Sequence, residues 1–527
     1  MYDHASRPGK PSSKEEDAPS PDKPPEPPIT RIPSVLPDAE TSPAATSANN
    51  TTPASGYAVG GGEDGGDNGG ANLRRASTVP SPHFALPLWR KSVIIMITSF
   101  TALSVAFAST SLFPLTSEIA GDLGTTPVVV QVTNALVLFT MGCSGFVWAP
   151  VGRLAGRKQA WIGASVVFLL CTAGTALAPR AAEEKTRLKI FVAMRILSGF
   201  EGTFFHVTGQ TWLADIFEPT QRGTATGFFL LGTVFGPAFG PCISGIMVTY
   251  AAWTSILWLQ CAMIGVGLVS SIFFLPEIRR PGDTERRKAA TSSVLGILKE
   301  FNPSPVFKVM LLPNVILTDL TCGLLSWSQY TLLAAPRHLL NPRFHLTTPL
   351  VSGLFYIAPG IGFLLGTVVG GKFSDMTVIK WIRIRGFRLP QDRLNSGMVS
   401  FFFVIPASCL IYGWGLQYEV GGLALPIVTA FFYAGGLLMA FASVNTYCAE
   451  VLPKSRTEVI ASKYFWQYTF STAGSGTIVP MIDAIGIGPA STIGVAFVLL
   501  GGVLTFITAK FGLQMQHWAQ RKGVGSP

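Results

Sequence analysis

Twelve stretches of roughly 20 apolar residues follow one another between positions 92 and 512, and roughly 20 such residues are what a helix needs to cross a bilayer core about 30 Å thick. Only 13% of the residues are charged, against about 25% in ordinary soluble proteins. The sequence therefore predicts an all-α membrane protein with twelve transmembrane helices, and it disfavours an ordinary soluble enzyme.

The predicted spans form two groups of six. The first group covers 92–114, 128–150, 160–179, 190–211, 223–248 and 255–275, and the second covers 309–335, 349–371, 397–417, 423–447, 459–482 and 489–512. The spans at 423–447 and 459–482 are the weakest, because they carry Asn445, Lys463 and several tyrosines. We expect an N-terminal six-helix bundle over 89–276, a cytoplasmic linker at 277–308, a C-terminal six-helix bundle over 309–513 and a tail at 514–527.

Residues 1–88 differ from the rest of the chain. They contain 15 prolines, a glycine-rich run at 60–70 and a net charge of −4. Such a composition buries too little apolar surface to offset the entropy of folding, so it predicts a disordered tail. The segment also lacks the pattern of a secretory signal.

The distribution of Lys and Arg predicts the orientation. With the tail inside, 26 of these residues flank the cytoplasmic ends of the spans and six lie in outer loops. Positive charge collects on the cytoplasmic side of membrane proteins. Both termini are therefore expected in the cytoplasm, and the net charge of +10 is a topology signal and not a sign of nucleic-acid binding.

Metal and redox chemistry are not expected. The seven cysteines lie within spans or at an inner end, none of them forms a C-x-x-C pair, and the six histidines are scattered. This pattern predicts no disulfide, no zinc site and no cofactor. It also gives no support to an enzyme.

Two acids inside predicted spans are candidates for proton coupling, Glu201 in the fourth span and Asp319 in the seventh. A charge in the bilayer core is costly, so each such group is a functional candidate. Burial favours the neutral form of a carboxylic acid, which would let it exchange protons near cytosolic pH. The alternative is a carboxylate held permanently by neighbouring donors.

Two cations inside spans, Arg195 and Lys463, are candidates for binding an anionic substrate. Arg195 would otherwise extend toward the outer surface, and Lys463, four residues into its span, is expected to extend toward the inner surface. His206 is expected to be a packing residue.

Neutral polar and aromatic side chains complete the predicted cavity. Ser326 and Tyr330 follow Asp319 at i+7 and i+11 and share its helical face. The remaining candidates are Tyr356, Asn445, Tyr447, Tyr464, Gln467 and Tyr468. Such residues suit a small-molecule pocket, and they suit ordinary hydrogen bonds between helices equally well.

Glycines recur every four residues in two spans, at Gly232, Gly236 and Gly240 in the fifth and at 362, 366 and 370 in the eighth. This spacing places them along one face and lets helices approach closely. Pro237 and Pro241 interrupt the first row and loosen the helix. We expect a seam along which helices move, with static packing as the alternative.

Several segments resemble those of a known family. Residues 232–241 (GTVFGPAFGP) look like the antiporter signature of major facilitator superfamily drug exporters, and residues 195–202 (RILSGFEG) are similar to its fourth-helix R-x-x-Q-G pattern, with Ser198 in place of Gln. Residues 149–158 (APVGRLAGRK) resemble its loop 2–3 signature. Residues 275–277 and 353–375 resemble the fungal twelve-span drug:proton antiporters of the quinidine-resistance type.

The loop 2–3 segment departs from the family pattern. Arg153 stands at the position of the signature's acid, and shifting the alignment places Gly156 there instead, while Arg157 keeps its basic character. In the family that acid helps to latch the cytoplasmic gate. Asp375, in the equivalent loop of the second half, is expected to carry the latch alone.

The resemblance implies a monomeric, proton-coupled exporter in the fungal plasma membrane, with a small organic molecule and protons as its partners and the lipid bilayer around it. The branch includes exporters of drugs, polyamines, glycolipids, secondary metabolites and itaconate-type organic acids, and the two buried cations mildly favour an organic acid. The alternatives are an importer or facilitator, and a sensor that binds ligand without moving it.

Overall fold

The computed structural model describes residues 86–217, 222–277, 293, 296, 301–344, 353–453 and 455–522. The predicted tail lies almost wholly outside these residues, as does most of the predicted linker. The described residues all fall within one compact unit, Ser77–Pro527, and their regular structure is helical throughout.

Helices occur at each predicted span of the first group. They are α1 (Leu88–Thr110), α3 (Pro127–Ala155), α4 (Arg157–Leu177), the pair α5 (Glu184–Gly199) and α6 (Gly202–Ile216), α7 (Arg222–Tyr250) and α8 (Thr254–Phe274). A short helix, α2 (Thr116–Asp122), follows α1.

Helices also occur at each predicted span of the second group. They are α12 (Pro313–Ala334), α15 (Ile357–Arg385), α16 (Ile405–Gln417) with the turns before it, α17 (Ala424–Glu450), α18 (Arg456–Ile485) and α19 (Ile487–Arg521). Two short helices flank α12, namely α11 (Ser304–Met310) and α13 (Pro336–Arg343).

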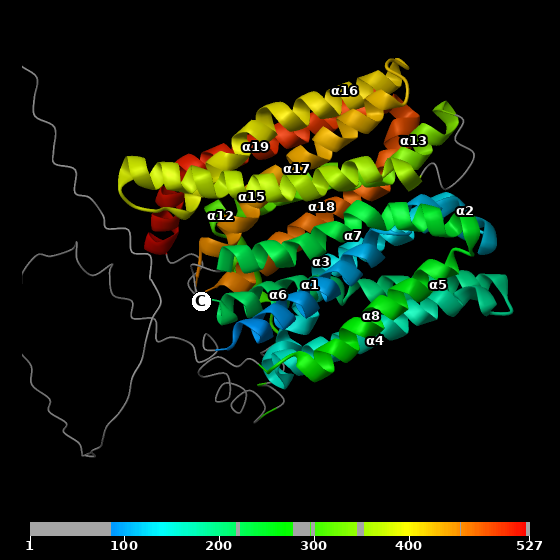
Figure 1. The fold of residues 1–527 in the computed structure, drawn as a ribbon, viewed down its shortest axis with the longest axis horizontal. Coiled ribbons are helices and arrows are strands. Elements are labelled where there is room, and N and C mark those ends of the chain that lie inside the picture. The colour runs from blue at the N-terminus through cyan, green and yellow to red at the C-terminus, as the bar shows by residue number, and fades with distance from the viewer. Residues whose placement is uncertain are drawn as a thin grey trace, which may run out of the picture. The chain divides into compact units, whose positions relative to one another are not determined.

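Long helices run side by side along one common direction (Figure 1). The helices of the first group, blue to green, lie together, and those of the second group, yellow-green to red, lie together beside them. The main contacts between the groups join α3 to α18 and α7 to α15. We refer to the contacts between the two groups of helices as the seam.

Ten helical segments of the described chain are long and apolar enough to cross a membrane, and an eleventh is formed if α11 and α12 count as one bent span. The helix α18 has 30 residues but does not meet this criterion, because polar side chains such as Lys463 and Gln467 lower its hydropathy. The span count of the described residues is therefore ten or eleven by composition, against the twelve predicted.

Several predicted spans are not continuous α-helices, and two of the interruptions bear on the candidate residues and on the span count. The span predicted at 309–335 breaks, with α11 and α12 at 93° to each other, since Pro313 has no N–H to extend the preceding helix. The span predicted at 190–211 is interrupted between Gly199 and Gly202, so Glu201 lies at a helix break and not within a helix.

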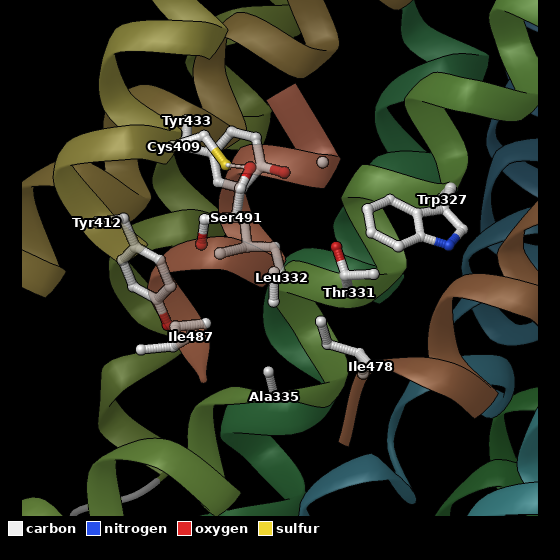
Figure 2. Close-up of a pocket in the computed structure, with 12 residues that line it drawn as sticks. Trp327, Thr331, Leu332, Ala335, Cys409, Tyr412, Tyr433, Ile478, Ile487 and Ser491 are labelled. Carbon is white, nitrogen blue, oxygen red and sulfur yellow. Dashed lines mark hydrogen bonds between the residues drawn. The ribbon is translucent and has the colours of Figure 1, made fainter. Parts of the chain in front are cut away.

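A small cavity lies among α12, α16, α17, α18 and α19 (Figure 2). It measures about 30 Å³, and polar groups of Thr331, Tyr412 and Ser491 contribute to its lining. This volume suits a water molecule and is far below the several hundred Å³ of a pocket for an organic ligand. The cavity as it stands is too small for an organic substrate, and buried polar groups also lie between the two groups of helices.

Candidate functional site

Asp319 is the acid at the centre of a buried polar cluster. It lies on α12 with 0% of its surface exposed. The Ser462 hydroxyl on α18 donates a hydrogen bond to its Oδ2, whereas its Oδ1 has no partner. A buried oxygen without a donor is costly. The protonated form of Asp319 reduces this cost, which agrees with its predicted part in proton coupling.

Lys463 follows Ser462 on the same helix and is 2% exposed. Its Nζ donates to Asn445 Oδ1 on α17 at 2.9 Å and lies 3.6 Å from the centre of the Tyr464 ring. The prediction that Lys463 extends toward the inner surface is therefore wrong. The ammonium points into the bundle, because an amide oxygen and an aromatic face stabilise it there.

The helix α6 brings two further side chains to this cluster across the seam. The Gln210 side chain donates to the Tyr464 hydroxyl at 2.9 Å, and the His206 ring lies 5.6 Å from the Tyr464 ring. His206 is fully buried and interacts electrostatically with Lys463. We call His206, Gln210, Asp319, Asn445, Ser462, Lys463 and Tyr464 the central polar cluster.

Sequence reasoning missed two members of this cluster, Gln210 and Ser462. Gln210 follows His206 at i+4, so the two share one face of α6, and that spacing was a usable signal. Ser462 had no such signal, because serines are common in these helices and only the packing of α18 on α12 selects this one.

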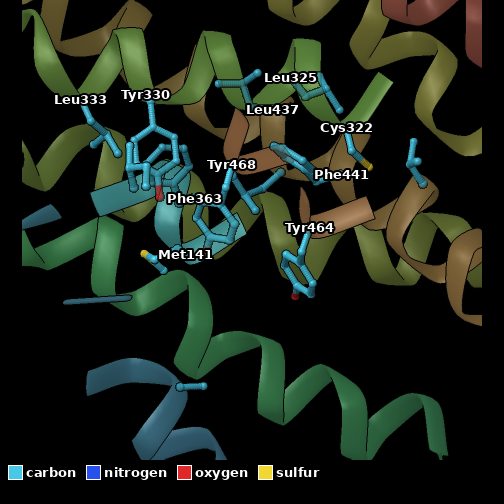
Figure 3. Packing of buried hydrophobic residues seen from close by; sticks show 14 of the residues in the cluster. Met141, Cys322, Leu325, Tyr330, Leu333, Phe363, Leu437, Phe441, Tyr464 and Tyr468 are labelled. Atoms are coloured by element: carbon cyan, nitrogen blue, oxygen red, sulfur yellow. The ribbon is translucent and has the colours of Figure 1, made fainter. Parts of the chain in front are cut away.

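Aromatic side chains continue from the cluster along α18 and onto α12. Tyr464 stacks on Tyr468 with ring centres 6.1 Å apart, and Tyr330 packs edge-on against Phe113 at 6.1 Å. Figure 3 shows Tyr330, Tyr468 and Tyr464 among the buried apolar side chains. The predicted cavity face of α12 is thus closed in this conformation, with Ser326 buried and its hydroxyl without a partner.

Three other predicted cavity residues have different surroundings. The Tyr356 hydroxyl donates to the Leu333 carbonyl at 2.9 Å, and the Tyr447 hydroxyl accepts from Asn314 at 3.1 Å. Both hydroxyls therefore hold helices together in this conformation. Gln467 is half-buried, and its Oε1 has no partner.

Glu201 and Arg195 are both buried, and they are not paired. Each is 2% exposed. Arg195 donates to the Ala108 carbonyl on α1 at 2.6 Å, so it does not extend toward the outer surface as its alternative interpretation would require. Glu201 Oε2 has no partner. The two prime candidates for proton coupling therefore share one property, a buried carboxylate oxygen without a donor.

Glycines flank Glu201 and bring its helix break onto α3. A Cβ added to Gly199 would lie 2.6 Å from the Val137 carbonyl oxygen, and one added to Gly202 would lie 2.7 Å from the Met141 side chain. Only glycine permits this approach. The packing holds the carboxyl of Glu201 inside the bundle.

The glycine row of α7 packs against α1 and not across the seam. A Cβ on Gly232 would lie 2.3 Å from the Ser99 carbonyl oxygen, and one on Gly236 would lie 2.4 Å from the Phe107 nitrogen. Gly240 approaches Thr110. Pro237 and Pro241 lie inside the same unbroken helix. The row therefore joins two helices of the same group.

The eighth predicted span shows the same arrangement, since Gly362, Gly366 and Gly370 on α15 approach α17. Other residues form the seam between α7 and α15. A Cβ on Gly360 would lie 2.5 Å from the Ala238 carbonyl oxygen, and Gly353 approaches Gly245. The repeated glycines therefore lie between helices of the same group, and the movement of helices along them stays a prediction.

The loop between α3 and α4 compensates for its missing acid. Gly156 has φ +103°, a conformation that glycine adopts readily. The Glu277 carboxylate accepts from the backbone N–H groups of Arg157 and Lys158 at 3.2 and 3.3 Å, and Arg157 pairs with Asp215 at 2.7 Å. Acids from elsewhere in the chain therefore neutralise this loop around Arg153.

Asp375 does not act alone at its end of α15. Arg393 bonds to Asp375 at 2.9 Å and to Glu450 at 3.1 Å, and Glu450 also pairs with Arg388 at 2.7 Å. The network joins α15, the turn before α16 and α17. Asp375 thus shares Arg393 with Glu450, and its part in a latch stays a prediction.

This arrangement of buried polar groups on paired helix bundles agrees with comparisons to known proteins. A family model described as Major Facilitator Superfamily matches residues 98–476, which is more than half of the chain. The chain belongs to the Major Facilitator Superfamily. Members of this superfamily are membrane transporters, so the protein is a transporter and not an enzyme.

Curated relatives of this superfamily member are fungal. It is 21% identical over 545 residues to the MFS antiporter QDR3 of Candida albicans, covering 79% of this chain and 76% of that one. It is 23% identical over 450 residues to the efflux pump FUB11 of Gibberella moniliformis, covering 82% and 74%. It is 26% identical over 463 residues to the transporter mfs1 of Schizosaccharomyces pombe, covering 82% and 84%.

A solved structure shows the fold of the superfamily member. The xylose transporter XylE from E. coli, in a partially occluded inward-open conformation, superimposes with a TM-score of 0.60 at 14% identity, covering 80% of this chain and 98% of that one. At this identity the likeness concerns the fold alone.

Proposed function

We propose that this protein is a proton-coupled exporter of a small organic molecule in the plasma membrane. It has twelve spans in two six-helix halves and both termini in the cytoplasm. The observation that carries the proposal is that Asp319, within the central polar cluster, is buried with one carboxylate oxygen unpartnered. Its relatives include an antiporter and an efflux pump, which supports export in exchange for protons.

The buried cations favour an organic acid or an acidic secondary metabolite over a xenobiotic drug. Lys463 contacts the seam through the Tyr464 ring, and its hydrogen-bond partner Asn445 is neutral. A carboxylate of the substrate would supply the missing counter-charge. Arg195 adds a second fixed positive charge, bonded only to a carbonyl oxygen among the described groups.

Transport into proteoliposomes tests the proposal, with radiolabelled itaconate as the probe. An antiporter accumulates the probe when the lumen is acidic, because protons leave as the probe enters. Passive diffusion of a weak acid gives the opposite result, accumulation in an alkaline lumen. Accumulation with an acidic exterior that exceeds the accumulation in protein-free liposomes would identify an importer, and binding without flux would identify a sensor.

Comparison of secreted metabolites with and without the gene tests the choice of substrate. We expect one acidic compound to accumulate inside the cells and to disappear from the medium. If the missing compound is a polyamine or a glycolipid, the export proposal stands and the organic-acid part of it fails.

A further inference from the structure

The inference concerns the ammonium group of Lys463 and rests on the proposed proton-coupled export. Ser462 and Lys463 are adjacent on α18, and they donate hydrogen bonds to two different acceptors. Ser462 bonds to Asp319 on α12, whereas Lys463 bonds to Asn445 on α17. The residue that bonds to the titratable acid Asp319 is therefore the direct neighbour in the chain of the buried cation Lys463.

Asp319 still has a free acceptor on its side of the cluster. Its Oδ1 has no partner, and the charge of Lys463 acts on it electrostatically. When Asp319 is protonated, the neutral acid needs no cation, and the amide oxygen of Asn445 is an adequate acceptor for Lys463. When Asp319 is ionised, the buried carboxylate is strongly stabilised by a nearby cation.

We propose that Lys463 is a positioning residue whose ammonium group moves from Asn445 to Asp319 when Asp319 releases its proton. The proton passes to water on the side to which the site is open, and the ammonium then neutralises the carboxylate. The net charge of the site falls by one when the proton leaves, and the ammonium, which stays within the site, now pairs with the carboxylate.

The same movement reaches the seam. The ammonium lies on the face of the Tyr464 ring at 3.6 Å, and the hydroxyl of that ring accepts the hydrogen bond from Gln210 on α6. When the ammonium moves toward α12, Tyr464 loses its cation–π contact. The Tyr464 ring is then free to shift, and with it the hydrogen bond from Gln210 that joins α6 to α18. The protonation state of Asp319 is thereby linked to the relative movement of the two groups of helices.

Three other titratable groups of the described chain interact with Asp319 or Lys463. They are Cys322 on α12 and Cys448 on α17, which interact electrostatically with Asp319, and His206 on α6, which interacts with Lys463. The α19 residues beside this part of α12 are Gly501 and Thr505, which bond or approach through neutral oxygens. Lys463 is therefore the nearby cation among the described groups that lowers the cost of an ionised Asp319.

Double electron–electron resonance in nanodiscs tests the inference without a substrate. Spin labels at Leu88→Cys and Lys380→Cys report the distance between α1 and α15, since both positions are exposed. A Cys143→Ser background is suitable, because the other six cysteines are buried. The distance distribution is recorded from pH 5 to pH 9, and the midpoint of its change is the readout.

Two variants should move this midpoint in opposite directions. Lys463→Met removes the cation that stabilises ionised Asp319, so ionisation requires more alkaline conditions and the midpoint rises by about 1 pH unit or more. Asn445→Leu removes the competing acceptor, so Lys463 stays with Asp319 and the midpoint falls. Lys463→Arg keeps the charge and should stay near the wild type.

Lys510→Met is the matched control, since it removes an exposed lysine from α19 and should leave the midpoint unchanged. A wild type whose distances do not respond to pH would overturn the proposed proton coupling. A wild type that responds, with the same midpoint in Lys463→Met and Asn445→Leu, would overturn the role of Lys463 and leave the proposed function standing.

Discussion

The Gln210 side chain on α6 donates a hydrogen bond of 2.9 Å to the Tyr464 hydroxyl on α18. These residues lie 254 positions apart in the chain and join the two groups of helices at the depth of the buried Lys463. The contact explains why the seam is closed at this level, and it gives the proton-coupling residues a direct path to the helices that have to separate.

Replacement of Asp319 by asparagine should abolish the accumulation of probe driven by an acidic lumen. The amide oxygen still accepts the hydrogen bond from Ser462, but the amide group does not take up or release a proton as the pH changes. We expect accumulation to fall at least about 10-fold, while exchange of labelled for unlabelled probe continues. Loss of both activities to the same extent would show that Asp319 serves binding or folding instead.

Glu201→Gln distinguishes the second candidate acid. Glu201 lies at the break between α5 and α6, with one carboxylate oxygen unpartnered. If both acids carry protons, the single variant should reduce the number of protons moved per probe molecule, measured with a pH dye in the lumen. An unchanged ratio would assign proton coupling to Asp319 alone.

Gly236→Ala should destabilise the protein. The added Cβ would meet the backbone of α1 at 2.4 Å, and overpacking of this kind costs about 1–3 kcal/mol. Thermal unfolding in detergent measures the effect. Gly227→Ala on the same helix is the control, because nothing lies within 4 Å of its added Cβ, and equal unfolding temperatures for the two variants would contradict the close packing.

Gly360→Ala should act on conformation more than on stability. Its added Cβ would lie 2.5 Å from the Ala238 carbonyl oxygen across the seam, so the closed contact between α7 and α15 is disfavoured and separation of these helices relieves the clash. Resonance distances between labels on the outer ends of α7 and α15 should lengthen. Gly371→Ala, with open space around its Cβ, should leave them unchanged.

Asp375→Asn should have a smaller effect on transport than Glu450→Gln. Arg393 keeps Glu450 as a partner when Asp375 is neutralised, whereas loss of the Glu450 charge leaves both Arg388 and Arg393 without that shared acid. Exposed pairs contribute up to about 1 kcal/mol each, so we expect less than about a 5-fold change for Asp375→Asn. Initial rates of probe uptake compare the two variants, and the reverse order would contradict the network.

The apolar runs of the sequence were sufficient to predict helices at all twelve positions, and the family resemblance was confirmed by the match over residues 98–476. Glu201, Asp319, Arg195 and Lys463 could be singled out because a charged residue in an apolar run is visible without any structure. The bend before Pro313 and the interruption at Glu201 were not predicted, since hydrophobicity does not register where a helix is interrupted.

Partners in space could not be predicted from one sequence. Nothing near Lys463 in the chain shows that its ammonium points to Asn445 on another helix, and nothing near the glycine row of α7 shows that it faces α1 and not α15. The sequence by itself determined which segments are helical and which charged residues lie within apolar runs, because transfer into an apolar medium depends on local composition. The tertiary structure alone decided which charge meets which acceptor and where the two groups of helices touch, because these depend on the rotation and depth of each helix against its neighbours.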